Sequence, residues 1–152
     1  MSDPKNKKQK SSIIFRFYKP EITGTSSLQV YAHKVPAGFP SPAEDFLEKD
    51  LNLNDYLISN KAATFLVRVE GNSMIGAGIL PDDLLVIDRS IEPEDGKIVL
   101  GVLNGEFTIK RLMKKGKQLF LRAENEDYQP IEITEEMSFQ VFGVVTFAIH
   151  KV

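Results

Sequence analysis

The sequence contains no cysteine, no tryptophan and only two histidines, His33 and His150. Without cysteine the chain has no disulfides and no thiolate chemistry. Zinc sites are built mainly from cysteine and histidine, so two distant histidines argue against zinc, and we expect neither a metal nor a cofactor. Histidine is also the usual activator of a serine nucleophile, and neither histidine here lies in a context that suggests this role.

Long apolar segments are missing as well. No apolar run approaches the roughly 18 residues that a membrane-spanning helix needs. The polar N-terminus, MSDPKNKKQKSS, leads into no apolar stretch of the kind found in secretory signals. We therefore expect a cytoplasmic protein without a membrane partner. The length of 152 residues fits one domain plus an arm.

The net charge of −2 conceals two regions of opposite charge. Residues 1–37 carry seven basic and two acidic side chains, a net charge of +5, whereas residues 38–152 carry 12 basic and 19 acidic side chains, a net charge of −7. A basic segment of this kind can fold back onto the acidic body, reach for an acidic partner or remain a solvated, disordered leader. The acidic body itself is poorly suited to direct DNA binding.

The segment PAGFPSP, residues 36–42, contains three prolines and a glycine and predicts an exposed boundary between an arm and a body. Just beyond it, Ser41, Pro42 and Glu44 form the pattern of a helix start, which predicts a helix to about Lys49. The sequence LNDYLI, at 53–58, predicts a second short helix.

From Ala63 onward the apolar residues repeat with a period of two, which is typical of strands. Asn104-Gly105 is a strong hairpin signal, because both central residues of a type I′ turn need positive φ. The body is therefore predicted to be mainly β, with one helical element at its start. The expected strands, including two before the body, are 13–18, 27–35, 64–71, 83–89, 97–103, 106–113, 117–124 and 138–152.

Ser73 lies in VEGNSMIGAGILPDD, between a predicted strand and a glycine-rich turn. A serine hydroxyl is a poor nucleophile until a base removes its proton. Without a suitable histidine, a neutral lysine is one remaining base, provided that burial lowers its pKa. In GEFTIKRLMKK, alternation places Lys110 on the same strand face as Leu112, which makes Lys110 the candidate. From the pattern alone, Ser73 can equally be a turn residue and Lys110 an exposed strand lysine.

Beyond Ser73 and Lys110, five segments of the sequence resemble a known protein family. They are PAGFPSPAEDF (36–46), VEGNSMIGAGILPDDLLVIDRS (69–90), GEFTIKRL (105–112), ENEDYQPI (124–131) and FQVFGVV (139–145). Together they resemble the LexA/UmuD family of self-cleaving serine–lysine peptidases, in the expected order and over nearly all of residues 36–145. Their joint occurrence is specific, although GNSM alone is a weak motif.

The resemblance implies a fold and an activity. It implies a mainly β peptidase domain of the LexA/UmuD type over residues 38–152, with a flexible arm over residues 1–37 that self-cleavage removes. The nucleophile of the family corresponds to Ser73 and its general base to Lys110. We therefore expect a serine endopeptidase that cuts its own chain.

The resemblance also places the scissile bond between Ala37 and Gly38. Both residues are small, so the bond can enter a narrow cleft at little steric cost, and glycine permits unusual backbone angles. The backbone N–H groups of Ser73 and Met74 are candidates for stabilising the oxyanion.

In this family a RecA filament on single-stranded DNA promotes cleavage. The processed chain forms a homodimer and serves with a Y-family polymerase subunit, UmuC, in error-prone translesion synthesis. The resemblance implies these partners and a place in the SOS response to DNA damage. LexA and phage repressors carry a DNA-binding domain before the peptidase domain, and the residues before Ala37 contain no helix-turn-helix pattern, which favours the UmuD-like members.

Two alternatives remain open from the sequence. One is a binding module or repressor-like antagonist with a vestigial peptidase site, and the other is a peptidase that cuts a repressor in trans. Signal peptidases share the Ser-Met motif and the lysine base, but the sequence lacks their membrane anchor. We also hypothesise that the arm covers an acidic or apolar surface of the body, which cleavage would free for a polymerase.

The segment FQVFGVVTFAI, residues 139–149, is apolar on both alternating sets of positions. Such a strand either lies in the centre of a sheet or has one face against another chain. The sequence leaves both arrangements open.

Overall fold

The structure is a computed structural model that describes residues 17–21, 23, 27–28, 37–38 and 50–152. The predicted helix up to Lys49 and most of the predicted strands 13–18 and 27–35 lie outside the described residues. The described elements are β1 (Phe17–Tyr18), β2 (Ser27–Leu28), β3 (Leu51–Asn52), α1 (Leu53–Leu57), β4 (Thr64–Arg68), the 3₁₀ turn η1 (Ile75–Ala77), β5 (Leu84–Asp88), β6 (Ile98–Leu103), β7 (Glu106–Lys115), β8 (Gln118–Arg122), β9 (Ile131–Ile133) and β10 (Phe139–Ile149).

The mainly β prediction is confirmed. From β4 onward, each predicted strand is present with ends that differ by at most three residues. The predicted helix at 53–58 is α1, which begins after the N-cap Asn52, whose side chain accepts a hydrogen bond from the Asn54 N–H. The hairpin between β6 and β7 turns at Asn104 and Gly105, which have φ values of 49° and 81° as the type I′ signal predicts. Within the described residues no helix is long and apolar enough to cross a membrane.

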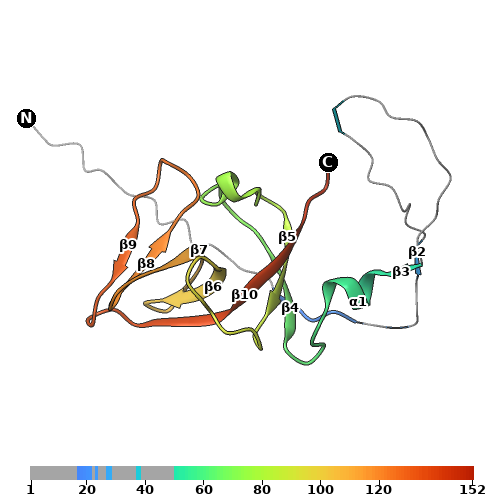
Figure 1. Cartoon of the computed structure of the whole chain (residues 1–152), viewed down its shortest axis with the longest axis horizontal. Coiled ribbons are helices and arrows are strands. Elements are labelled where there is room, and N and C mark those ends of the chain that lie inside the picture. Colours follow the sequence, from blue (N-terminus) through green and yellow to red (C-terminus); the bar gives the residue numbers. More distant parts are fainter. Residues whose placement is uncertain (1–16, 22, 24–26, 29–36, 39–49) are drawn as a thin grey trace, which may run out of the picture.

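One antiparallel sheet forms the body, in the strand order β1-β4-β5-β10-β6-β7-β8-β9. Figure 1 shows β10 as the long strand that crosses this body. The second half of β10 pairs with β5 and its first half pairs with β6, with a register shift in each pairing. The apolar pattern of residues 139–149 is therefore explained by a central position in the sheet.

The sheet is strongly curled. In a flat sheet with strands about 4.8 Å apart, β1 and β7 would be separated by roughly 24 Å. Instead, the ring centroids of Phe17 in β1 and Phe107 in β7 lie 4.8 Å apart. Curling therefore brings the end of the sheet that contains β4 close to β7.

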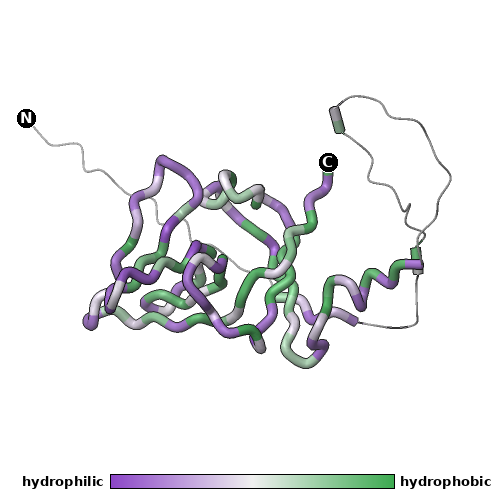
Figure 2. The backbone as a smooth tube through the Cα atoms, viewed as in Figure 1, coloured by the Kyte–Doolittle hydropathy of each residue, from purple (hydrophilic) through white to green (hydrophobic). Residues whose placement is uncertain are grey.

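Two groups of buried side chains fill the body, and Figure 2 shows hydrophobic residues concentrated along its strands. The larger group, called here the main core, joins residues of β4 and β5 to residues of β6 and β7, so it holds the curl in place. It consists of Val67, Val69, Met74, Ile79, Leu85, Ile87, Leu100 and Ile109. The smaller group consists of Val99, Leu112, Leu121 and Val144.

Candidate active site

The loop that carries Ser73 leaves β4 in a fixed direction. Beyond the end of β4, the Val69 N–H donates to the Asp83 carbonyl at 2.9 Å, and the Asp82 N–H donates to the Val69 carbonyl at 3.0 Å. Gly71 then adopts a φ of 87°, a conformation that glycine reaches without steric cost. The chain turns at this glycine, and Ser73 follows two residues later.

Buried neighbours hold the Ser73 loop on the body. Met74, next to Ser73, is 2 % exposed and belongs to the main core, as does Ile79 at the end of the loop. The Ile79 N–H donates to the Met74 carbonyl at 3.3 Å, which closes the loop around η1. Because Met74 is fixed by packing, the half-buried Ser73 side chain is also held in place.

Lys110 approaches the same point from β7, where it pairs across the ladder with Val99 of β6. Its Nζ lies 3.2 Å from Ser73 Oγ. The same nitrogen lies 3.0 Å from Thr108 Oγ1 and 3.0 Å from the Ile109 carbonyl oxygen. Curling of the sheet thus brings together the two candidates that lie 37 positions apart in the sequence.

The surroundings of Lys110 favour its neutral form. Burial removes water from the ammonium group and lowers the pKa of Lys110 below its ordinary value of 10.5. A neutral amine has two hydrogens and one lone pair. The Ile109 carbonyl and Thr108 Oγ1 can take the two hydrogens, which leaves the lone pair to accept the Ser73 O–H proton. This arrangement suits a general base that activates a serine.

A pocket of about 20 Å³ opens beside this pair. Its lining residues come from the Ser73 loop and from β7, so the pair lies at the junction of two distant parts of the chain. They are Val69, Glu70, Gly71, Ser73, Met74, Thr108, Ile109 and Lys110.

The other predicted site residues lie as follows. Ala37 and Gly38 are exposed, a side chain at Gly38 would meet open space, and neither residue lines the pocket. The hydrogen bonds of the 72–79 turn use N–H groups of residues 75–79, so the N–H groups of Ser73 and Met74 take no part in them. The structure therefore brings Ser73, Met74 and Lys110 together and leaves the predicted scissile bond outside.

A network of hydrogen bonds holds Asn72, the residue before Ser73, against the 124–128 loop. The Tyr128 hydroxyl donates to Asn72 Oδ1 at 2.8 Å, and Asn125 Nδ2 donates to the Asn72 carbonyl at 2.9 Å. Nearby, the Gly76 N–H donates to the Glu124 carbonyl at 2.7 Å. A Cβ at Gly76 would lie 2.6 Å from that carbonyl oxygen, so only glycine allows this approach.

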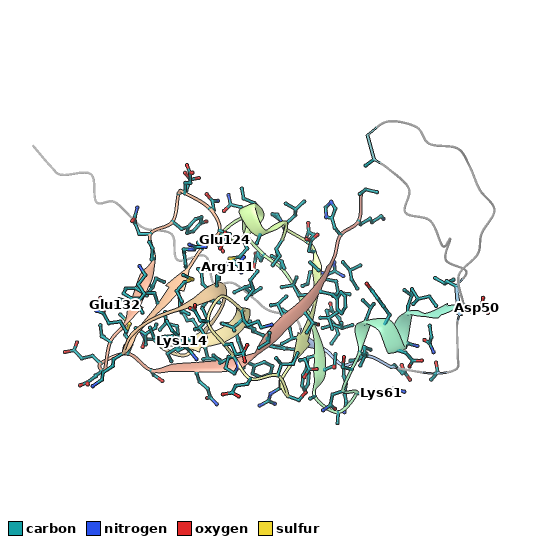
Figure 3. All side chains as sticks on the ribbon, in the orientation of Figure 1. Asp50, Lys61, Arg111, Lys114, Glu124 and Glu132 are labelled. Carbon is teal, nitrogen blue, oxygen red and sulfur yellow. The ribbon has the colours of Figure 1, made fainter. Side chains whose placement is uncertain are left out.

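Glu124 also joins this loop to the strand that carries Lys110. Its carboxylate accepts hydrogen bonds from Arg111, the neighbour of Lys110, and from Arg122. These bonds, the one from Arg111 first, hold the pKa of Glu124 below its ordinary value. Figure 3 shows Arg111 and Glu124 side by side. Residues 124–128 therefore contact the Ser73 loop through the Glu124 carbonyl, Asn125 and Tyr128. They contact β7 through the Glu124 carboxylate.

Sequence reasoning assigned no role to Thr108, Asn72, Asn125 or Tyr128. Thr108 shares the strand face of Lys110, and this spacing of two was the available signal. The segment ENEDYQPI contributed to the family resemblance, but its contact with Asn72 depends on the folded arrangement. Within the described part of the chain, no three His, Asp or Glu side chains are grouped as a metal site requires.

The sequence is similar to those of several known proteins. Residues 29–146 match the family model described as Peptidase S24-like. The chain is similar to Protein ImpA of Escherichia coli, with 41% identity over 93% of this chain and 96% of that protein. It is also similar to Protein SamA of Salmonella typhimurium, with 45% identity over 83% of this chain and 87% of that protein. The similarity to the LexA repressor of Acidithiobacillus ferrooxidans, at 42% identity, covers 74% of this chain and 56% of that protein.

Proposed function

The chain belongs to the Peptidase S24-like family, and we propose that it is a serine peptidase that cuts its own Ala37-Gly38 bond. In this proposal Ser73 is the nucleophile and Lys110 the general base. The observation that carries the proposal is the 3.2 Å separation between Lys110 Nζ and Ser73 Oγ, in surroundings that lower the pKa of the lysine. A role for Lys110 as a solvated surface charge does not account for these contacts.

The reaction proceeds in two steps. Neutral Lys110 takes the Ser73 proton as Oγ bonds to the Ala37 carbonyl carbon, and the Ser73 and Met74 N–H groups stabilise the oxyanion. The Ala37-Gly38 bond then breaks, and the Lys110 ammonium gives its proton to the leaving amine of Gly38. In the second step Lys110 takes a proton from a water molecule as the water oxygen bonds to the Ala37 carbonyl carbon, and it returns that proton to Ser73 Oγ as the ester bond breaks.

Self-cleavage requires residues 37–38 to enter the pocket. The bond is exposed and outside the pocket lining, so the cleavable arrangement is a separate conformer. The apparent rate is the intrinsic rate multiplied by the population of that conformer. In our proposal, a RecA filament on single-stranded DNA raises this population, as the family resemblance implies.

The biological role follows from the same resemblance. We assign the chain to the SOS response in the cytoplasm, with a processed form over residues 38–152 that acts as a homodimer. This form would serve as a subunit of an error-prone translesion polymerase, with a UmuC-like Y-family subunit as its partner. Cleavage removes a segment of net charge +5 and leaves the acidic body.

The intact mass of the purified chain after incubation at alkaline pH tests the activity. We expect a new species that begins at Gly38, absent from Ser73→Ala and present in Ser59→Ala, a control at an exposed serine. A first-order rate that is independent of protein concentration indicates cleavage within one assembly rather than in trans. If no cleavage occurs at alkaline pH or with activated RecA filament, the chain is instead a binding module with a vestigial peptidase site.

A further inference from the structure

The short strand β1 covers the β4 edge of the sheet with few contacts. It pairs with β4 at two positions, one of which joins Phe17 to Val67. The Phe17 ring centroid lies 4.8 Å from that of Phe107 and 5.4 Å from that of Phe142. Phe17 nevertheless remains 39 % exposed. Among the described residues, β1 is attached by two paired positions and by the aromatic ring of Phe17.

The body supplies a preformed site for that side chain, which we call the aromatic socket: Phe65, Phe107 and Phe142. These residues come from β4, β7 and β10. Phe142 contacts both others, with centroids 5.8 Å from Phe65 and 5.7 Å from Phe107, and the Arg89 guanidinium lies 4.5 Å from its ring centroid. Phe107 and Phe142 also pack against the main core. The socket is thus part of the body, whether or not Phe17 fills it.

The predicted scissile bond lies, along the sequence, between the two strands of each of two pairs. β1 pairs with β4, and β2 pairs with β3. In each pair the first strand precedes Ala37 and the second follows Gly38. Cleavage of this bond would therefore cut the covalent link between β1 and its site while leaving the site intact.

We infer that cleavage vacates the β4 edge and the aromatic socket, which then bind an extended segment of a partner protein that carries an aromatic side chain in the place of Phe17. This inference rests on the proposed function, because it assigns the consequence of cutting the Ala37-Gly38 bond. Of the acidic and apolar surfaces that the arm was hypothesised to cover, the inference selects an apolar one.

The tether explains why cutting would release such a weakly attached strand. Residues 19–50 connect β1 to β3, a span of 32 residues. The covalent connection makes the pairing of β1 with β4 intramolecular, and effective concentrations for linked segments are on the order of 1 mM. A free arm at 1 μM would be about a thousandfold more dilute. An attachment with a dissociation constant between these values is occupied before cutting and empty afterwards.

The vacated site fits an extended segment for two reasons. The outer edge of β4 would present unpaired N–H and C=O groups, which a further strand can satisfy. The socket recognises an aromatic ring, because its three phenylalanines offer edges and faces to a fourth ring. The edge sequence TFLVR is mostly apolar, and an uncovered apolar edge strand is a site to which another strand adds.

The test measures the binding of a fluorescein-labelled peptide IIFRFYKP, residues 13–20, by fluorescence anisotropy. The protein is the full chain with Ser73→Ala and a recognition sequence for a site-specific protease in place of residues 36–40. It is measured before and after the added protease cuts it. We expect the cut protein to bind the peptide at least about tenfold more tightly than the uncut protein.

Two matched substitutions sharpen the result. A peptide with Phe17→Ala should lose at least about tenfold in affinity for the cut protein, whereas one with Tyr18→Ala should stay within about twofold, because neighbouring strand residues face opposite ways. In the uncut chain, Phe17→Ala should open the site and bring peptide binding close to that of the cut protein.

Equal binding before and after cutting would overturn the inference, as would equal binding by the two substituted peptides. Sedimentation of the cut chain distinguishes another occupant: self-association that excludes the peptide would assign the β4 edge to a second copy and overturn the partner assignment. Because an added protease makes the cut, this result does not depend on whether the chain cleaves itself.

Discussion

The described strands before Ala37 are shorter and more exposed than the strands of the body after Gly38. β1 and β2 have two residues each, and Phe17, Tyr18 and Leu28 are between 39 and 52 % exposed. The strands β4 to β10 instead enclose two buried cores, and residues such as Leu85 and Leu121 are completely covered. Every residue of the two buried cores follows Gly38, whereas β1 and β2 contribute two paired residues each. In the proposed function, this difference lets the cutting of one peptide bond change what is attached to the body.

The largest expected effect concerns chemistry in the body. Lys110→Ala should lower the rate of self-cleavage by about 10²- to 10⁴-fold, because it removes the general base. Lys114→Ala, on the same strand, is the control, since Lys114 is exposed and its Nζ donates to the Pro93 carbonyl. Intact mass over time measures both rates, and full-rate cleavage by Lys110→Ala would exclude it from the mechanism.

A pair of leucine substitutions tests the structural contrast directly. Leu121→Ala should lower the free energy of unfolding by about 2–5 kcal/mol, because it leaves a cavity in a fully buried site. Leu28→Ala, before the proposed cleavage site, should change this free energy by about 0.5 kcal/mol or less, because that side chain is 52 % exposed. Urea unfolding followed by circular dichroism measures both, and comparable losses would show that the strands before Ala37 are as integral as the body.

The pH dependence follows from the lowered pKa of Lys110. Cleavage should rise about tenfold per pH unit while most of the lysine is protonated, and should level off at a pH below 10.5. Stability should follow the same group: burial disfavours the charged form, so the native state gains stability as pH rises from the folded pKa towards 10.5.

Lys110→Met tests both pH effects, the one on the cleavage rate and the one on the free energy of unfolding. It should abolish cleavage, stabilise the fold at neutral pH and lose that advantage above pH 10.5, as measured by urea unfolding at several pH values. A cleavage rate that stays flat from neutral to strongly alkaline pH would contradict the assignment of a lysine base.

The smallest effect concerns the loop that holds Ser73. Tyr128→Phe removes the hydroxyl that donates to Asn72, which should cost about 0.5–1.5 kcal/mol, or a 2- to 12-fold lower cleavage rate. The pH midpoint of the rate should not move, because Lys110 is untouched. Tyr56→Phe, at an exposed tyrosine in α1, is the control, and equal rates for both variants would remove Tyr128 from the positioning of the site.

Much of the body could be predicted from the sequence, because its strands follow the period-two rule and its main hairpin carries the Asn104-Gly105 signal. β9 was not predicted, because it has only three residues and follows Pro130. β3 was not predicted either, because it has only two residues. These strands depend on pairing with distant partners more than on their own sequence.

The candidate site was only partly predictable. The residue pattern supplied Ser73 and Lys110 as possibilities, and the family resemblance joined them as a pair. The contacts of Lys110 with Thr108 Oγ1 and the Ile109 carbonyl depend on side-chain rotation within β7. The contact between Asn72 and Tyr128 joins residues 56 positions apart, and no local pattern encodes such a distance.

The central position of β10 has a consequence for the timing of synthesis. β4 and β5 lie on one side of β10, and β6 to β9 lie on the other, so the last strand to be made joins the two halves of the sheet. Ser73 follows β4 and Lys110 lies in β7, one on each side. While the ribosome is still adding residues before Phe139, the two halves lack the strand that unites them. In the proposed function, a growing chain therefore lacks a complete cutting site until β10 has been made.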